Sequence, residues 1–202
     1  MREHIAIVRY NAGNIFSVDY ALKRLGIQAE ITGDHNRLRN ADKVIFPGVG
    51  EAGTTMAYLR EHGLDQVIGS LTQPVLGICV GLQLMCRHSE ESDVDCMGIF
   101  DEQVLRFQNP AGERFKIPHM GWNSLEIKPG AKLFKGIPNH SYVYFVHSYY
   151  LKADDESIVA ASTEYSTHIH ASVERDNVFA CQFHPEKSSS VGLHILSNFA
   201  NM

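Results

Sequence analysis

The 202-residue sequence has no long apolar run, only four cysteines and no cluster of basic residues. No run approaches the roughly 20 apolar residues that a membrane-spanning helix needs. The net charge of −5 gives no electrostatic footprint for nucleic acid. The cysteines lack the paired spacing of a zinc site and are sparse for a disulfide scaffold. The first residues show no signal-peptide character, so a reduced, cytoplasmic protein is expected.

What is present is an ordinary globular composition, with 44% hydrophobic and 20% charged residues. A chain of this length can bury one sizeable core. The sequence contains no repeat, low-complexity stretch or linker that would divide it. One domain is therefore expected over residues 1–202.

The first half of the chain alternates strand-like and helix-like segments. Apolar residues recur at helical spacing between residues 15 and 25, and Gly26 follows as a stop signal. The strand-like runs are short and apolar, as in strands buried on both faces. We therefore expect an α/β fold with a mostly parallel central sheet and helices on both faces. The expected strands are 5–8, 27–31, 44–46 and 74–78, and the expected helices are 15–25, 54–62 and one that follows residue 79.

The second half is rich in strand-like segments separated by turn residues. Because no convincing helix lies between them, they are expected to extend the sheet in a mixed or antiparallel manner. A closing helix is expected after Ser188, since Val191, Ile195 and Phe199 share one face. The expected strands are 122–127, 142–150, 158–161, 168–173 and 178–183.

The segment Gly77-Ile78-Cys79-Val80-Gly81 ends the fourth strand and indicates a sharp turn into a helix. A glycine two positions to either side of Cys79 lets neighbouring backbone approach the turn. This is the nucleophile-elbow pattern with cysteine in place of serine. The dipole of the following helix favours the reactive thiolate form. Cys79 is therefore the candidate nucleophile, although most free cysteines are simply small buried residues. Cys86 and Cys181 lack this setting and are expected in the core.

A candidate base and an orienting carboxylate follow the strand at 178–183. His184 and Glu186 are two residues apart, so in an extended chain both side chains project to one side. Pro185 is expected to exclude a helix there and to stiffen the pair. Glu186 is expected to fix the imidazole tautomer, and His184 to take the thiol proton. Taken alone, this His and Glu could equally belong to a surface loop.

The segment Pro47-Gly48-Val49-Gly50 follows the third strand and is the candidate oxyanion hole. A glycine-flanked backbone can turn an N–H group toward a developing negative charge, and Val80 N–H would be the second donor. A simple strand-ending turn is the alternative. This segment, Cys79 and His184 all lie just past the carboxyl ends of strands, so they are expected to meet at one sheet edge. Gln83, one helical turn after Cys79, could face the same pocket.

His168 and His170 alternate on a strand in a way compatible with metal binding. The sequence offers no third ligand for them. Exposed histidines on an edge strand are therefore the favoured interpretation, and no metal site is expected.

Together these segments resemble the class I (triad) glutamine amidotransferases, a family with a Gly-x-Cys-x-Gly elbow, a downstream His-Pro-Glu and a Pro-Gly-x-Gly oxyanion strand. The resemblance covers essentially the whole chain. It implies a flavodoxin-like fold and hydrolysis of glutamine through a cysteine thioester, with no cofactor. It places Cys79, His184 and Glu186 in the catalytic triad. The groups around the glutamine are expected from Gly48, Val49, Gly50, Val80, Gln83, Glu91 and the Ser148-Tyr149 backbone.

Within that family, four further segments resemble the glutaminase subunits of imidazole glycerol phosphate synthase, an enzyme of histidine biosynthesis. This narrower resemblance implies a heterodimer with a cyclase subunit that folds as a (β/α)8 barrel and receives the ammonia. It also implies that Asn11, Asn14, Trp122, Asn123 and Lys187 face the cyclase, with a core position as the alternative for Trp122. The four segments are residues 10–18, 119–123, 144–149 and 184–188.

Three alternatives stay open. The first is a glutaminase serving another synthase, of the pyridoxal phosphate or anthranilate type, against which Lys187 and the segment 119–123 argue. The second is a γ-glutamyl hydrolase or cysteine peptidase that uses the same elbow without a partner. The third, a catalytically silent regulatory protein that binds a metabolite, is disfavoured by the intact triad. Arg9, Asn11 and Ala52 depart from the family pattern and leave the contacts of the first turn open.

Overall fold

The computed structural model describes residues 4–11 and 13–202. An eight-stranded sheet forms its centre, in the order β2-β1-β3-β4-β14-β13-β12-β9. The strands from β2 to β14 in this order pair in parallel, and β13, β12 and β9 continue the sheet antiparallel. The strands are β1 (Ile5–Val8), β2 (Ala29–Thr32), β3 (Lys43–Gly48), β4 (Val75–Cys79), β9 (Glu126–Ile127), β12 (Val159–Glu164), β13 (His168–Arg175) and β14 (Val178–Cys181).

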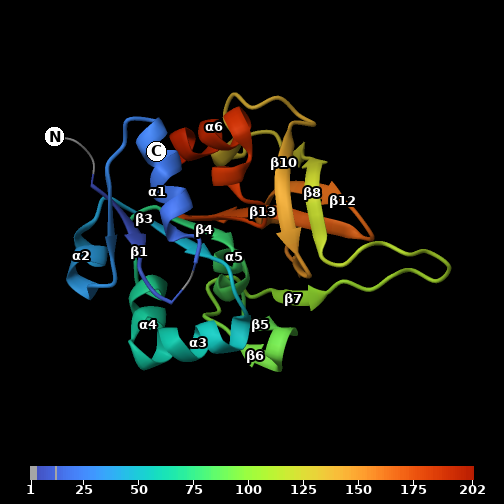
Figure 1. Ribbon diagram of the computed structural model, residues 1–202, viewed down its shortest axis with the longest axis horizontal. Coiled ribbons are helices and arrows are strands. Elements are labelled where there is room, and N and C mark those ends of the chain that lie inside the picture. Colours follow the sequence, from blue (N-terminus) through green and yellow to red (C-terminus); the bar gives the residue numbers. More distant parts are fainter. Residues whose placement is uncertain (1–3, 12) are drawn as a thin grey trace.

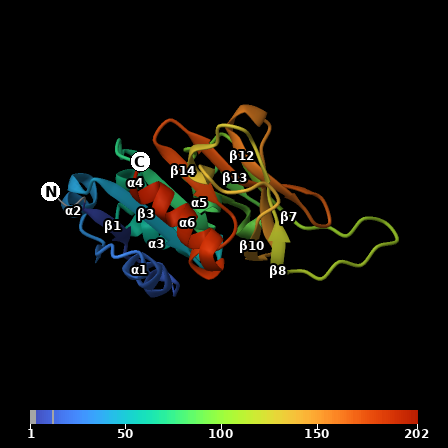
Figure 2. The same ribbon diagram turned by 90° about the horizontal axis from the view of Figure 1, so that it is seen from above.

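Helices cover both faces of this sheet (Figure 1). On one side α1 and α6 pack against each other, and Figure 2 shows α6 lying across the central strands. On the other side lie α3, α4 and α5, while α2 lies beside the edge of the sheet. The helices are α1 (Ile15–Arg24), α2 (His35–Asn40), α3 (Ala52–Glu61), α4 (Leu64–Gly69), α5 (Val80–Met85) and α6 (Ser189–Ala200).

Two smaller sheets flank the carboxyl ends of the parallel strands. One pairs β8 (His119–Ser124) with β10 (Tyr142–His147), and the other has the order β11-β7-β5-β6. The connection between β7 and β8 extends away from the body of the molecule (Figure 1). The remaining strands are β5 (His88–Ser89), β6 (Val94–Asp95), β7 (Gln103–Arg106) and β11 (Tyr149–Lys152).

The expected fold class is confirmed, and so is the antiparallel extension of the sheet by β13 and β12. The single strand expected at 142–150 is wrong, because the chain breaks at Ser148 and its two parts join different sheets. The short helices α2 and α4 and the strands β5, β6 and β7 are not anticipated by the sequence patterns. Each is too short to show a clear apolar period.

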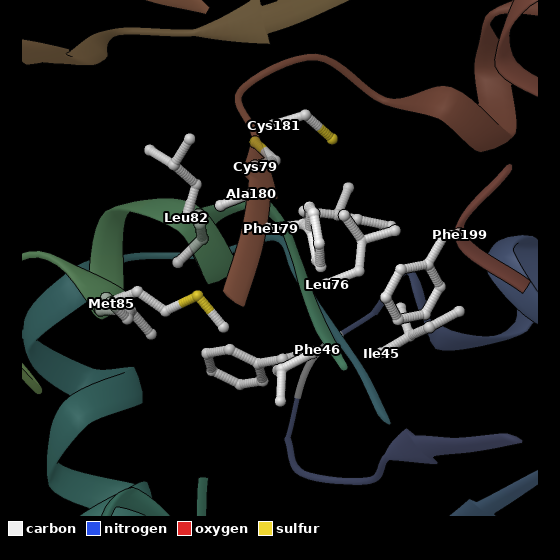
Figure 3. Close-up of a cluster of buried hydrophobic side chains, with 14 of the residues drawn as sticks. Ile45, Phe46, Leu76, Cys79, Leu82, Met85, Phe179, Ala180, Cys181 and Phe199 are labelled. Atoms are coloured by element: carbon white, nitrogen blue, oxygen red, sulfur yellow. The ribbon is translucent and has the colours of Figure 1, made fainter. Parts of the chain in front are cut away.

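The core is packed on both faces of the parallel strands. Ile7, Ile45 and Leu76 on β1, β3 and β4 are fully buried. Figure 3 shows part of this cluster, with Cys79 and Cys181 at the top and Phe46 near the bottom. Among the described residues, no helix has the length and apolar character to cross a membrane.

Candidate active site

Strand register brings the predicted site segments together. In the parallel pairing of β3 with β4, Gly48 lies directly beside Cys79. On the other side of β4, Cys181 pairs with Ile78, so the chain reaches His184 three residues later at the same edge. The expected convergence at the carboxyl ends of the strands is therefore present.

The elbow at Cys79 has a backbone conformation that few side chains adopt. Cys79 has φ 55° and ψ −109°, a positive φ that is strained for any residue except glycine. The next glycine tolerates no side chain, since a Cβ at Gly81 would lie 2.1 Å from the carbonyl oxygen of Phe46. A Cβ at Gly77 would lie 2.7 Å from the sulfur of Met85. Close packing against backbone thus requires glycine at position 81, whereas at position 77 the closest atom belongs to a flexible side chain.

Gly48 ends β3 under the elbow. A Cβ there would lie 2.7 Å from the hydroxyl oxygen of Tyr10 and 2.9 Å from the backbone nitrogen of Gly81. The same hydroxyl donates a 2.6 Å hydrogen bond to the carbonyl of Pro47. Gly48 therefore packs beneath the site, while Val49 and Gly50 line its cavity. Gly50 has φ +133°, which glycine adopts without strain.

His184 and Glu186 form a buried pair. His184 Nδ1 donates to Glu186 Oε1 at 2.7 Å, and neither side chain is exposed to solvent. Such a bond fixes which ring nitrogen carries the proton and how the imidazole is oriented. The other ring nitrogen, Nε2, is buried without a hydrogen-bond partner among the described residues, so it is free to act on a group in the pocket.

The charge state of His184 is set by its two neighbours. Burial lowers the pKa of His184, but its interactions with the Cys79 thiol and the Glu186 carboxylate outweigh this and raise the pKa to about 10. The imidazole of His184 is therefore in its protonated, positively charged form at neutral pH. A proton held beside a nucleophile is what a departing amine requires.

The local backbone here differs from the expected extended chain. Residues Pro185–Lys187 form a single 3-10 turn, so the expectation that Pro185 prevents a helix was wrong. Proline suits the first position of a helix because its missing N–H is not needed there. The turn is held by β10: His184 N–H donates to the carbonyl of Tyr144 at 2.9 Å, and the hydroxyl of Ser188 donates to the carbonyl of His184 at 2.6 Å.

A buried amide that sequence reasoning missed also contacts the nucleophile. Gln182 Nε2 lies 3.6 Å from Cys79 Sγ, at hydrogen-bond distance for sulfur. Its Oε1 accepts from Gln83 Nε2 at 3.0 Å, which leaves the nitrogen of Gln182 facing the thiol. Gln182 is fully buried in an otherwise apolar run, and that contrast is the signal that could have identified it.

A cavity of about 320 Å³ opens beside Cys79. It also borders residues that the sequence did not single out, among them Pro118 and Val146. The carbonyl of Val146 accepts from Cys79 Sγ at 3.9 Å. The predicted site residues that line the cavity are Val49, Gly50, Cys79, Val80, Gln83, Glu91, Ser148, Tyr149 and His184.

Glu91 lines the cavity next to the start of α3. Its carboxylate accepts a 2.9 Å hydrogen bond from the backbone N–H of Ala52, the first residue of α3. Burial raises the pKa of Glu91, the Ala52 hydrogen bond lowers it, and the nearby Glu51 raises it, with a net upward shift. A carboxylate at this place can attract an ammonium group in the cavity.

Two neutral histidines support the Ser148-Tyr149 backbone. A carbonyl can only accept, so His147 Nδ1 donates to Tyr149 O at 2.8 Å and His147 Nε2 must accept from His119 Nδ1 at 2.9 Å. Burial lowers the pKa of His147 to about 3 and that of His119 to about 4. Asn123 Nδ2 lies 3.4 Å from His119 Nε2 and completes the chain of hydrogen bonds.

The residues expected to face a partner do not share one environment. Trp122 is 52% exposed, which excludes the core position considered for it, and Asn11 and Lys187 are exposed as well. Asn123 is half-buried. Asn14 departs from the expectation of a facing surface: it is 6% exposed, and its amide nitrogen donates to the carboxylate of Glu186.

An apolar face lies next to Trp122 on the two-stranded sheet. Trp122 pairs with Tyr144 across the strands, and their rings meet edge to face with centroids 5.9 Å apart. Met120 and Tyr142 on the same strands are 61% and 59% exposed. Exposed apolar side chains gathered in this way are typical of a protein interface.

The interpretation of His168 and His170 was partly wrong. Strand β13 lies inside the sheet, between β12 and β14, and only His168 is exposed. His170 is buried and accepts from the backbone N–H of Ala153 at 2.8 Å. Within residues 4–11 and 13–202, no group of three or more His, Cys, Asp or Glu side chains is placed to hold a metal ion.

A larger hollow of about 1020 Å³ lies elsewhere, between the segment 127–139 and the end of α6. It contains lysines and apolar groups but none of the predicted site residues. Size therefore does not identify the reactive site in this molecule. The smaller cavity holds the cysteine, the imidazole and the strained elbow together.

Comparison with known proteins gives one family. The family model described as glutamine amidotransferase class-I matches residues 8–202. The imidazole glycerol phosphate synthase subunit HisH of Bacteroides thetaiotaomicron is 56% identical over 198 residues, covering 98% of this chain and 99% of the relative. The protein of the same name from Pelagibacter ubique is 41% identical, covering 98% of this chain and all of the relative.

Solved structures give the same fold at lower identity. A structure described as a glutamine amidotransferase superposes with a TM-score of 0.72 at 22% identity, covering 98% of this chain and 99% of that one. The structure of PurLQS from Thermotoga maritima gives a TM-score of 0.72 at 17% identity, covering 100% and 99%. These likenesses bear on the fold alone.

Proposed function

Since the chain belongs to the class-I glutamine amidotransferases and, within them, to the HisH subunits of imidazole glycerol phosphate synthase, we propose that it is a glutaminase supplying ammonia for histidine biosynthesis. The observation that carries this function is the buried Cys79, His184 and Glu186 arrangement at a strained elbow beside a cavity. Residues 1–202 act as one glutamine amidotransferase domain, in the cytoplasm.

In the first step, the proton of the Cys79 thiol resides on His184, Cys79 Sγ attacks the carboxamide carbon of glutamine, and a bond forms between sulfur and carbon. The bond from that carbon to nitrogen then breaks, and His184 gives its proton to the departing ammonia. Glu186 keeps the imidazole oriented throughout. The developing oxyanion is stabilised by backbone N–H groups of the Val49-Gly50 segment and of Val80.

In the second step, water attacks the γ-glutamyl thioester. His184 takes a proton from the water, the carbon–sulfur bond breaks, and glutamate leaves with Cys79 regenerated. Gln83, Glu91 and the Ser148-Tyr149 backbone hold the substrate, and Glu91 lies where the α-ammonium group of glutamine would bind. These side chains and backbone groups supply the chemistry without a cofactor.

The ammonia is consumed by a partner. We assign that role to the cyclase subunit with its (β/α)8 barrel, which produces imidazole glycerol phosphate and the aminoimidazole carboxamide ribotide. The exposed face around Trp122, together with Asn11 and Lys187, supports docking on this side of the molecule. Asn123 connects that face to Tyr149 through the two histidines.

The test is the release of glutamate from glutamine by the chain alone and after addition of the cyclase with its ribulosyl substrate. We expect a low rate for the chain alone and a marked increase in the complex. A rate that is the same with and without the cyclase would mean that another synthase, or no partner, uses this glutaminase. A chain that releases no glutamate under either condition would contradict the glutaminase itself.

A further inference from the structure

Asn14 is the N-cap residue of α1, but its side chain does not cap the helix. Asparagine is among the preferred residues there because its side chain can accept a backbone N–H of the first turn. The side chain of Asn14 makes no such bond. By contrast, Asp34 caps α2 in the usual way and accepts from the N–H of Arg37 at 2.9 Å. The amide of Asn14 is therefore used elsewhere.

It is used on the catalytic carboxylate. Asn14 Nδ2 donates to Oε1 of Glu186, the same oxygen that accepts from His184 Nδ1 at 2.7 Å. The carboxylate offers only acceptors, so the nitrogen of the amide must face it. Asn14 Nδ2 also lies 3.4 Å from His184 Nδ1, but that nitrogen donates to Glu186 and has no lone pair to offer.

The environment of the second oxygen of the Glu186 carboxylate shows why the hydrogen bond from Asn14 matters. Glu186 Oε2 is buried and has no hydrogen-bond partner among the described residues. Both hydrogen-bond donors identified among the described residues therefore act on one oxygen and hold the carboxylate in its orientation. A glutamate carboxylate turns easily about its last bond, so removal of one donor leaves the imidazole less firmly oriented.

The chain next to Asn14 is fixed against the opposite part of the site. A Cβ on Gly13 would lie 3.7 Å from Cγ2 of Val49, in ordinary contact with the oxyanion segment. Tyr10 holds the carbonyl of Pro47 at 2.6 Å. Tyr10 thus contacts the oxyanion segment, and Asn14 contacts the orienting carboxylate.

We propose that Asn14 is a positioning residue of the catalytic triad, which holds the Glu186 carboxylate so that His184 presents Nε2 to the pocket. This role rests on the proposed glutaminase function and adds a fourth side chain to its machinery. It also differs from the partner-facing role expected from the sequence.

The test uses Asn14→Ser and Asn14→Asp in the complex with saturating cyclase and its ribulosyl substrate. Serine is a good cap but too short to reach Glu186, and aspartate turns a donor into a second carboxylate. We expect kcat for glutamine hydrolysis to fall about tenfold for serine, the size of one hydrogen bond to a charged group, and further for aspartate. The KM for glutamine and ammonia-dependent synthesis should stay unchanged, and the melting temperature of Asn14→Ser should not fall.

Asp34→Ala is the matched control. It removes a working cap at a helix far from the site, so it should lower the melting temperature and leave kcat unchanged. Wild-type kcat in both Asn14 variants would overturn the positioning role. A loss confined to affinity for the cyclase, with full kcat at saturation, would also overturn it in favour of an interface role. If the wild-type complex released no glutamate, the proposed function would fail before the variants were compared.

Discussion

Replacement of Cys79 by alanine is expected to abolish glutamine-dependent synthesis by the assembled enzyme and to leave ammonia-dependent synthesis intact. The thiol is the group that bonds to the substrate carbon, so its loss should reduce the rate by at least about a thousandfold. The cyclase reaction needs only ammonia, which can be added directly. The measurement is the rate of product formation with each nitrogen source.

Alanine at position 79 removes the thiol without changing the backbone, so a loss of activity can be attributed to the thiol. Alanine retains the Cβ, so the strained φ of 55° at this position is unchanged and the fold should be little affected. Cys96→Ala is the matched control, because it removes a partly buried thiol outside the cavity and should leave both activities unchanged. Near-normal glutamine-dependent turnover in the Cys79 variant would remove the nucleophile assignment.

Among substitutions that add one methyl group to the site, Gly81→Ala is expected to have the largest effect on stability and activity. Its Cβ would lie 2.1 Å from the carbonyl oxygen of Phe46, a backbone atom that cannot move without displacing β3. Overpacking of this kind should lower the melting temperature by about 5–10 °C. Since α5 begins at Val80, the elbow and the Val80 N–H would shift too, and glutamine hydrolysis should be lost.

Alanine substitutions at two other glycines serve as comparisons for Gly81→Ala, with smaller expected effects. Gly77→Ala meets the flexible end of Met85 at 2.7 Å and should be milder than Gly81→Ala. Gly69 lies at the end of α4 with nothing within 4 Å, so alanine there should be neutral or slightly stabilising. Thermal melts and glutamate release would be recorded for all three. Equal behaviour of Gly81→Ala and Gly69→Ala would show that the elbow is not tightly packed.

The features that the sequence predicted well are those with strong local patterns. The apolar strand and the Gly-x-Cys-x-Gly spacing around Cys79 predicted the elbow, and the strand ends predicted which segments meet. The family resemblance drawn from these motifs is confirmed by the match over residues 8–202. Helix α1 also begins and ends within a residue of its expected bounds, since its apolar period and Gly26 are clear.

What the sequence did not predict depends on contacts between distant residues. Asn14 is 172 residues from Glu186 in the chain, and nothing near it indicates that its amide is buried there. The same holds for Gln182, which contacts a thiol 103 residues away. The break at Ser148 is also hidden, because a continuous strand-like run does not reveal that its halves pair with different sheets.

Local geometry explains the remaining error at Pro185. An extended chain and a 3-10 turn both accept proline, and the choice between them follows from hydrogen bonds to β10 and Ser188. In either form His184 and Glu186 are close. The predicted pairing of His184 with Glu186 is therefore correct, although the predicted backbone conformation was wrong.

The most direct measurement is the mapping of a glutamine-analogue electrophile, such as a diazoketone, onto the chain in complex with the cyclase and its ligand. Such a reagent bonds only to a nucleophile that can bind it as substrate. Cys86 and Cys181 are fully buried, and burial raises the pKa of both thiols, so neither should react. One adduct, on Cys79, is expected in the digested protein. An adduct on another cysteine, or none at all, would contradict the assignment of Cys79 as the nucleophile.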